Sequence, residues 1–496
     1  MIAESEYLAR DAVGLAELVR KKEVTPNELL DAALARAAKV EPKIHSIVMP
    51  MHAIARRRAA SSLEGAFAGV PFLVKDLHQG YAGVPLSSGN KALKKAHLGP
   101  HEHAEIVKRW LDTGVVIFGR TNTPEFGAKG ITEPEAWGPT HNPWNLAHSP
   151  GGSSGGAAAA VAAGIVPMAG ASDGGGSIRI PASATGLFGI KPGRGRTPWG
   201  PEQSEMLHGA AMNHVLTRSV RDSALMLDHS HGHELGGHFR IALPERAYAD
   251  EVGRDPGKLR IAFSTRSPLG TEVDPEAVKA VEDAARLLAS LGHDVEPGEP
   301  AIDGVRLAGD FLQMWFANMS VIVAEVRAQT GCGDEGFELD TLTMAAIGRG
   351  MSALQYLEGL KRWEEYGRRL AELHARYDVF MTPTTGGPAP EIGSVVTPPA
   401  LQRVVYAALK LGGGRLINLA KSAIDNVARD SLKHVPFTQL ANLTGVPAMS
   451  VPLHWCANGL PLGVQFVADH GGEGLLFRLA GQLEQARPWK ERRAVL

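Results

Sequence analysis

Short apolar runs alternate with amphipathic segments along most of this chain of 496 residues. Each run has the length of a buried strand, whereas the amphipathic segments repeat their apolar residues at helical spacing. The predicted strands are residues 70–74, 115–118, 165–169, 259–265, 378–385, 448–453 and 463–469. The predicted helices are residues 25–39, 102–112, 155–164, 274–291 and 472–486, with a mostly helical region over 304–377. Alternating strands and helices favour an α/β domain built on a mixed sheet.

Two serines lie in glycine-rich turns within one stretch of the chain, residues 149–192. Ser153 stands inside GGSSGG, residues 151–156, and Ser177 ends DGGGS, residues 173–177. Glycines around a serine let backbone N–H groups approach a ligand where a Cβ would clash, and such groups can form an oxyanion hole. Gly and Ser runs more often indicate a flexible linker, but a linker would not enclose a run of Ala and Val that favours burial.

A lysine closes the first predicted strand, because Lys75 follows the apolar residues 70–74 directly. A serine hydroxyl is a weak nucleophile unless a base removes its proton, and a lysine can be that base once burial lowers its pKa. Alone, Lys75 or either serine would be interpreted as a solvated surface residue. Their combination with two glycine-rich turns indicates catalysis. We expect kcat/KM to rise with pH, with an apparent pKa well below that of a free lysine.

The composition is that of an ordinary globular protein, with 21% charged residues and a net charge of -2. It lacks the basic footprint of a nucleic-acid-binding protein. The most apolar stretch, residues 157–171, is too short and too rich in Gly and Pro to span a membrane. The two cysteines, Cys332 and Cys456, form no disulfide or zinc motif, and the first residues carry no signal-peptide pattern. These features predict a cytoplasmic protein without a metal, a nucleic-acid partner or a membrane partner.

Several motifs extend the pattern around the two serines along the chain. They are VPFLVKD (70–76), FGRTNTPEFG (118–127), SPGGSSGGAAAAVAAG (149–164), SDGGGSIRIPASATGLFGIKP (172–192) and FTQLANLTGVPAMSVPL (437–453). Together they resemble the amidase signature family of serine amidohydrolases, over nearly the whole chain. The resemblance implies an α/β fold with a large mixed central sheet, helices on both faces and a helical insertion layer. It implies one domain over residues 1–496, with the signature core at about 60–228 and the helical layer at about 304–377.

The resemblance also implies a role for each candidate residue. Ser177 matches the nucleophile that becomes acylated, Ser153 matches a bridging serine that relays the proton, and Lys75 matches the general base. Ser153 would follow a cis peptide bond after Gly152. The implied backbone oxyanion hole consists of Gly174, Gly175, Gly176 and Ser177. The implied supporting residues are Gly152, Ser154, Ser172, Asp173 and Arg179, and the predicted substrate pocket includes Glu125, Phe126, Trp137, Trp315 and Met319.

One further segment indicates a class of substrate. TEPEAWGPTHNPWN, residues 132–145, is similar to hydrolases of the 6-aminohexanoate cyclic dimer within the same family. The implied reaction is hydrolysis of linear or cyclic carboxylic amides, with anilides, carbamates and esters as further substrates and with no cofactor. The expected partner is a small-molecule amide, and a homodimer is one expected assembly.

Four alternatives stay open at this point, one of which is a non-catalytic scaffold. The chain could be the glutaminase subunit of a tRNA-dependent amidotransferase complex. GGSSG also fits the G-x-S-x-G nucleophile elbow, which would make Ser153 or Ser154 part of a Ser-His-Asp triad with one of the 19 histidines. Two groups of histidines could bind a metal, although they lack the helical HExxH spacing of catalytic zinc sites. These groups are His97, His101 and His103, and His229, His231, His233 and His238.

Overall fold

The structure is a computed structural model that describes residues 2–395, 402, 406 and 429–496. Its described strands form one 11-stranded sheet with the order β1-β3-β2-β4-β6-β5-β10-β11-β9-β7-β8. The pairs β2/β3, β2/β4, β7/β8 and β7/β9 are parallel, and the other neighbouring pairs are antiparallel. The large mixed sheet expected from the sequence is confirmed.

The strands have the following bounds. They are β1 (Ile47–Pro50), β2 (Pro71–Lys75), β3 (Val116–Thr121), β4 (Met168–Asp173), β5 (Phe188–Lys191), β6 (Met212–Thr217), β7 (Arg260–Phe263), β8 (Asp294–Pro297), β9 (Val379–Pro383), β10 (Ala448–Trp455) and β11 (Pro461–Ala468). Each predicted strand has a counterpart in this set. Two of the others, β5 and β6, lie in the middle of the sheet.

The helices of the described residues have the following bounds. They are α1 (Glu4–Ala9), α2 (Ala12–Arg20), α3 (Pro26–Ile44), α4 (His52–Ala59), α5 (Lys91–Ala96), α6 (Glu105–Asp112), α7 (Gly155–Ala162), α8 (Arg179–Thr185), α9 (Val220–Ser230), α10 (Tyr248–Glu251), α11 (Pro275–Ser290), α12 (Gly304–Thr330), α13 (Leu339–Arg349), α14 (Ala353–His374), α18 (Gln439–Thr444) and α19 (Glu473–Ala486). Short 3₁₀ turns occur at Glu125–Gly127 and Asp334–Gly336.

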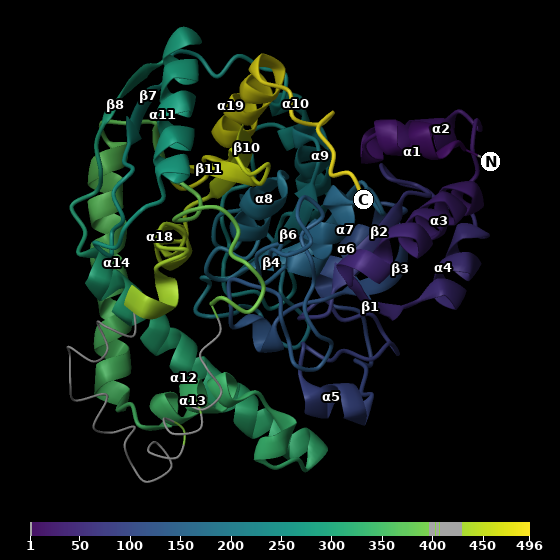
Figure 1. The fold of residues 1–496 in the computed structure, drawn as a ribbon, viewed down its shortest axis with the longest axis horizontal. Coiled ribbons are helices and arrows are strands. Elements are labelled where there is room, and N and C mark those ends of the chain that lie inside the picture. The colour runs from purple at the N-terminus through teal and green to yellow at the C-terminus, as the bar shows by residue number, and fades with distance from the viewer. Residues whose placement is uncertain (1, 396–401, 403–405, 407–428) are drawn as a thin grey trace.

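Helices cover both faces of the sheet. Phe466 of β11 belongs to a buried cluster with residues of α11 and α19, whereas the next residue, Val467, packs in a cluster with Leu370 of α14. Successive side chains of a strand point to opposite faces, so these two clusters lie on opposite sides of β11. The helical layer predicted over 304–377 corresponds to α12, α13 and α14, which lie together away from the N-terminal helices α1 to α4 (Figure 1).

The helix α12 is long and apolar enough to cross a membrane, by length and composition alone, and it is the one such helix in the described residues. In its most apolar window, 56% of the residues are buried inside the protein. Phe311, Met319 and Val323 are among its buried side chains, and α12 packs against α13 and α14. This is the environment of a core helix.

The strand β4 begins later than the hydrophobic pattern predicts, at Met168 instead of residue 165. Gly164 lies just beyond the end of α7 and has a φ of 76°. Pro167 follows two apolar residues and has no N–H to donate to a sheet ladder. The strand therefore starts after Pro167 and continues to Asp173, directly before the glycine-rich turn.

Candidate active site

Lys75 ends β2 and is buried, with none of its surface exposed. Its Nζ contacts the hydroxyls of three serines. The distances are 2.7 Å to Ser153 Oγ, 3.0 Å to Ser154 Oγ and 3.1 Å to Ser172 Oγ. The structure thus brings together residues that are about eighty to one hundred positions apart in the sequence, around one amine.

Burial lowers the pKa of Lys75 to about 7, against an opposing effect of the Asp173 carboxylate, which raises it. A charged ammonium loses its hydration in such a site, so the neutral amine is favoured. Near neutral pH a large fraction of Lys75 is therefore unprotonated and can accept a proton.

Ser153 lies at the junction before α7, and the peptide bond between Gly152 and Ser153 is cis. At Gly152 no side chain fits, because an added Cβ would lie 2.4 Å from the carbonyl oxygen of Ile131. The neighbouring Ser154 hydroxyl donates to the carbonyl of Ser172, and the Ser172 N–H donates back to Ser154 Oγ, both at 3.3 Å. These contacts fix the serine turn against the end of β4.

Ser177 lies in the turn between β4 and α8, and the Asp173 carboxylate organises that turn. Asp173 accepts the N–H of Gly176 at 2.7 Å and the N–H of Ile178 at 3.2 Å. It also forms a buried ion pair with Arg179, with both contacts at 2.9 Å. Burial alone would raise the pKa of Asp173, but the Arg179 charge holds it well below its usual range. Asp173 therefore stays ionised, and its carboxylate supports the turn.

Backbone N–H groups around Ser177 differ in availability. The N–H of Gly176 is engaged by Asp173, and Gly176 has a φ of 123°, which an L side chain rarely adopts. Within the described residues, the N–H groups of Gly174, Gly175 and Ser177 have no acceptor. Among the described residues, three of the four expected oxyanion donors therefore have no acceptor, and the fourth supports the turn.

A set of buried polar residues from the C-terminal part of the chain holds this turn from behind. The Thr438 hydroxyl donates to the carbonyl of Gly175 at 2.6 Å. Arg179 donates to the side chains of Asn442 and Gln465, at 2.6 Å and 2.7 Å. The sequence prediction missed all three residues. Their signal was present, because Thr438 and Asn442 lie in the motif at 437–453, but that motif was assigned no role.

A pocket of about 480 Å³ opens onto these serines. Ser153, Ser172 and Ser177 line it together with Gly174. The rest of its lining consists of Leu77, His78, Phe126, Gly127, Trp199, Met206, Leu207, Ala211, Trp315, Asn318, Met319 and Ile322. This set contains no Asp, Glu, Lys or Arg, so the described walls of the pocket suit an uncharged, largely apolar ligand.

Three of the five residues predicted for the pocket line it, namely Phe126, Trp315 and Met319. The other two lie outside the lining. Glu125 is buried and accepts hydrogen bonds from Asn90 and from the N–H of Glu338. The Trp137 indole donates to Ser87, and its ring lies under the ammonium of Lys94. These contacts explain why both side chains turn away from the pocket.

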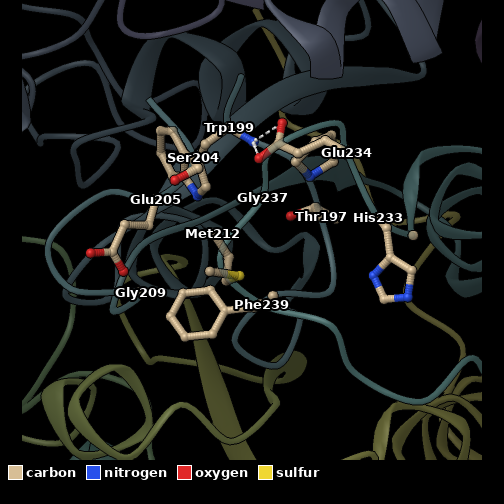
Figure 2. A pocket seen from close by; sticks show the side chains of 13 residues that line it. Thr197, Trp199, Ser204, Glu205, Gly209, Met212, His233, Glu234, Gly237 and Phe239 are labelled. Carbon is tan, nitrogen blue, oxygen red and sulfur yellow. Dashed lines mark hydrogen bonds between the residues drawn. The ribbon is translucent and has the colours of Figure 1, made fainter. Parts of the chain in front are cut away.

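A second pocket of about 330 Å³ adjoins the first, because Trp199 lines both. Figure 2 shows the Glu234 carboxylate facing the backbone N–H of Trp199, at 3.1 Å from each oxygen. The Trp199 indole donates to the carbonyl of Ala211 at 2.9 Å. Trp199 is thus a fixed partition between the two pockets.

Two of the alternatives left open by the sequence involve histidines. His78 is the histidine that lines the serine pocket, and within the described residues its ring has no carboxylate partner, as a Ser-His-Asp triad would require. Among the members of the two histidine groups, His233 lines the second pocket. One set of potential metal ligands lies elsewhere, at Glu276, His454 and Cys456, whose ligand atoms lie within 4.8 Å of one another. Its carboxylate already accepts from His454 and from the N–H of Ala457.

Comparison with known proteins places this site in context. A protein-family model described as Amidase matches residues 28–477. A 6-aminohexanoate-cyclic-dimer hydrolase of Paenarthrobacter ureafaciens is 38% identical over 508 residues, covering 99% of this chain and 97% of that protein. A putative amidase, AmiC, of Mycobacterium leprae is 38% identical, covering 97% and 95%. The solved structure of 6-aminohexanoate cyclic dimer hydrolase complexed with substrate matches with a TM-score of 0.88 at 35% identity, covering 98% and 99% of the two chains.

Proposed function

The chain belongs to the amidase signature family, and we propose that it hydrolyses small carboxylic amides through an acyl-enzyme on Ser177. One observation carries the proposal. The Nζ of buried Lys75 lies 2.7 Å from Ser153 Oγ, and Ser153 lines the same pocket as Ser177, whose turn carries three backbone N–H groups without an acceptor in the described residues. That arrangement supplies a base, a relay, a nucleophile and an oxyanion site.

The proton relay follows from what each hydroxyl can do. A neutral amine has two N–H groups and one lone pair, and three serine hydroxyls surround Lys75 Nζ. The Ser154 hydroxyl already donates to a carbonyl, so its oxygen accepts from Lys75. Ser153 is nearest and is the partner that gives its proton to the lone pair. Lys75 then acts as the base for Ser177 through Ser153.

Within the described residues the Ser177 hydroxyl has no hydrogen-bond partner, and its side chain opens onto the pocket. We infer that it turns toward Ser153 when a substrate binds, since catalytic hydrogen bonds commonly tighten in the bound complex. Ser177 Oγ attacks the amide carbonyl carbon as its proton passes to Ser153 and the Ser153 proton passes to Lys75. The N–H groups of Gly174, Gly175 and Ser177 receive the negative charge on the carbonyl oxygen.

The same groups complete the reaction. The carbon–nitrogen bond breaks as the proton held by Lys75 returns through Ser153 to the leaving nitrogen, which departs as an amine. Water then attacks the ester on Ser177, its proton passes to Lys75, and the carboxylic acid leaves as Ser177 regains its proton. The net reaction consumes one amide and one water and yields one acid and one amine.

The pocket supports uncharged substrates with an apolar acyl portion, because its described walls carry apolar and aromatic side chains and no charged group. The relative from Paenarthrobacter ureafaciens is named for a cyclic amide dimer. We therefore propose linear and cyclic aliphatic amides as the first substrates to assay, with anilides, carbamates and esters after them.

Labelling with a serine-reactive fluorophosphonate tests the proposal. We expect one adduct, at Ser177 by peptide mass spectrometry, with loss of amide hydrolysis in proportion to labelling. A folded Ser177→Ala variant should neither be labelled nor hydrolyse amides. Labelling at another residue, or full activity of that variant, would contradict the assignment.

A further inference from the structure

We propose that His78 is a substrate-binding residue that accepts a hydrogen bond from the N–H of the scissile amide and so makes the enzyme select amides over esters. This inference rests on the proposed function, because it concerns the leaving-group side of the same site. It identifies the substrate class as amides that carry an N–H on the nitrogen that is cleaved.

His78 is held in an unusual backbone conformation immediately after the base. Its φ is 59°, in the left-handed region that residues with a side chain seldom occupy. The Gln79 side chain closes the turn and ties it to β4, because it accepts the N–H of Lys75 at 2.6 Å and donates to the carbonyl of Ala171 at 3.1 Å. Such backbone conformations concentrate at functional sites, where the surrounding structure enforces them.

The ring of His78 reaches the pocket with its hydrogen-bonding capacity unused. His78 lines the pocket beside Leu77, and among the described residues its ring nitrogens have no hydrogen-bond partner. Its ring packs against Trp199, edge to face at a centroid distance of 5.5 Å. Because Glu234 (Figure 2) and the carbonyl of Ala211 both hold Trp199, that contact also restricts the His78 ring.

The position of this turn places His78 on the side of the pocket where the proton relay lies. Leu77 and Ser153 both approach Gly127, since an added Cβ there would lie 2.7 Å from Leu77 Cδ2 and 3.2 Å from Ser153 Oγ. The Lys75 charge is also near enough to lower the pKa of His78. Ser153 must return a proton to the leaving nitrogen, so that nitrogen lies beside this turn.

The charge state of His78 suits an acceptor. Burial, with a further effect of the Lys75 charge, lowers the pKa of His78 to about 4. The imidazole is therefore neutral at neutral pH and has one N–H and one free lone pair. An amide N–H can donate to that lone pair. An ester has an oxygen at the same place and no proton to donate, so the imidazole stays unpaired and the ester loses the interaction.

The test compares three substrates that share one acyl group: a secondary amide, its N-methyl tertiary amide and the corresponding ester. In the His78→Ala variant we expect kcat/KM for the secondary amide to fall by about 10 to 100-fold, the usual effect of losing one good hydrogen bond in a pocket. The values for the tertiary amide and the ester should change by less than about 3-fold. His78→Asn should retain part of the selectivity, because Asn tolerates a left-handed backbone and offers an acceptor.

His97→Ala is the matched control. His97 also has a positive φ, 55°, but it is exposed at the end of α5, away from the pocket lining. That variant also places Ala at a position with a left-handed backbone, but it should not change the ratio of amide to ester hydrolysis. An equal loss on all three substrates in His78→Ala, or no loss on the secondary amide, would overturn the role of His78. Failure of the proposed function has a different signature, labelling of the wild-type enzyme at a residue other than Ser177.

Discussion

Two buried lysines of this protein are nearly alike in position and in charge. Lys75 ends the apolar strand β2, and Lys191 ends the apolar strand β5. Both side chains are almost completely buried, and burial lowers the pKa of each to about 7. Their surroundings differ. Lys75 contacts three serine hydroxyls, two of which line the pocket, whereas Lys191 donates to the carbonyl of Pro192 at 2.7 Å.

The comparison separates two properties that are often treated as one. Burial gives either amine a pKa at which it can act as a base. Only the hydroxyl neighbours of Lys75 connect such a base to a nucleophile in the pocket. A lowered pKa is therefore insufficient evidence for catalysis, and the chemistry depends on what the amine contacts.

Replacing Lys75 should have the largest effect on kcat/KM, and the Lys75 and Lys191 variants should differ strongly. Lys75→Met keeps an apolar chain of similar size, and we expect kcat/KM for an amide to fall by about 10³ to 10⁴-fold, near the upper range for loss of a general base. Lys191→Met should retain kcat/KM within about 10-fold. Initial rates on both purified variants measure the difference, with thermal melts to show that both fold. Comparable losses in the two variants would remove the distinction.

The Asp173 carboxylate acts on both lysines, because it raises the pKa of each. Asp173→Asn should lower the free energy of unfolding by about 3–5 kcal/mol, since it leaves the buried Arg179 charge without its partner. Denaturant titration measures this change. The double variant Asp173→Asn/Arg179→Met should recover part of it. An unchanged free energy of unfolding in the single variant would mean that the pair does not organise the turn.

The pH dependence of the free energy of unfolding reports on Lys191 independently of catalysis. An unfolded lysine has a pKa near 10.4, so between about pH 7 and pH 10 the unfolded chain binds a proton that the folded chain lacks. The free energy of unfolding therefore rises with pH, by up to about 1.4 kcal/mol per pH unit for each such lysine. Lys191→Met should reduce that slope by about this amount between pH 8 and pH 10. Urea titrations of the wild type and the variant at three pH values measure this slope, and the pH profile of kcat/KM should stay unchanged. An unaltered slope would show that Lys191 is not neutral in the folded protein.

The smallest predicted change concerns a neighbour of Lys75. Ser154 Oγ accepts from Lys75 at 3.0 Å and so favours the protonated amine. Ser154→Ala should lower the pKa of Lys75, and the acidic limb of the kcat/KM profile should move to lower pH by about one unit or less. The profile of the Ser154→Ala variant between pH 5 and pH 9 measures this shift. A shift to higher pH would show that Ser154 does not stabilise the ammonium.

The hydrophobic pattern predicted much of the sheet, because buried strands such as β2 and β9 are apolar runs with clear ends. It did not identify β6, which carries Asn213, His214 and Thr217 at buried positions. The His214 imidazole is buried and shares a hydrogen bond of 2.9 Å with Ser223 of α9. A polar strand of this kind is recognisable only once its tertiary partners are known.

The candidate site shows the same limit. An apolar strand that ends in lysine occurs twice, in β2 and in β5, so that pattern alone could not single out Lys75 as the candidate base; the two glycine-rich turns and the family resemblance did. The engagement of the Gly176 N–H by Asp173 depends on the direction of one peptide in the turn. The contacts of Thr438 and Gln465 with the turn depend on how α18 and β11 pack against it. None of these is encoded in local sequence.

The pH dependence of Ser177 labelling by a fluorophosphonate, in the wild type and in the two lysine variants, tests the central claim most directly. We expect the wild type and Lys191→Met to be labelled at rates that rise with pH and level off, with a midpoint near 7, the pKa of Lys75. Lys75→Met should be labelled far more slowly and without that midpoint. A Lys75→Met variant that keeps the wild-type profile, or a Lys191→Met variant that loses it, would contradict the assignment of Lys75 as the base that acts on Ser177.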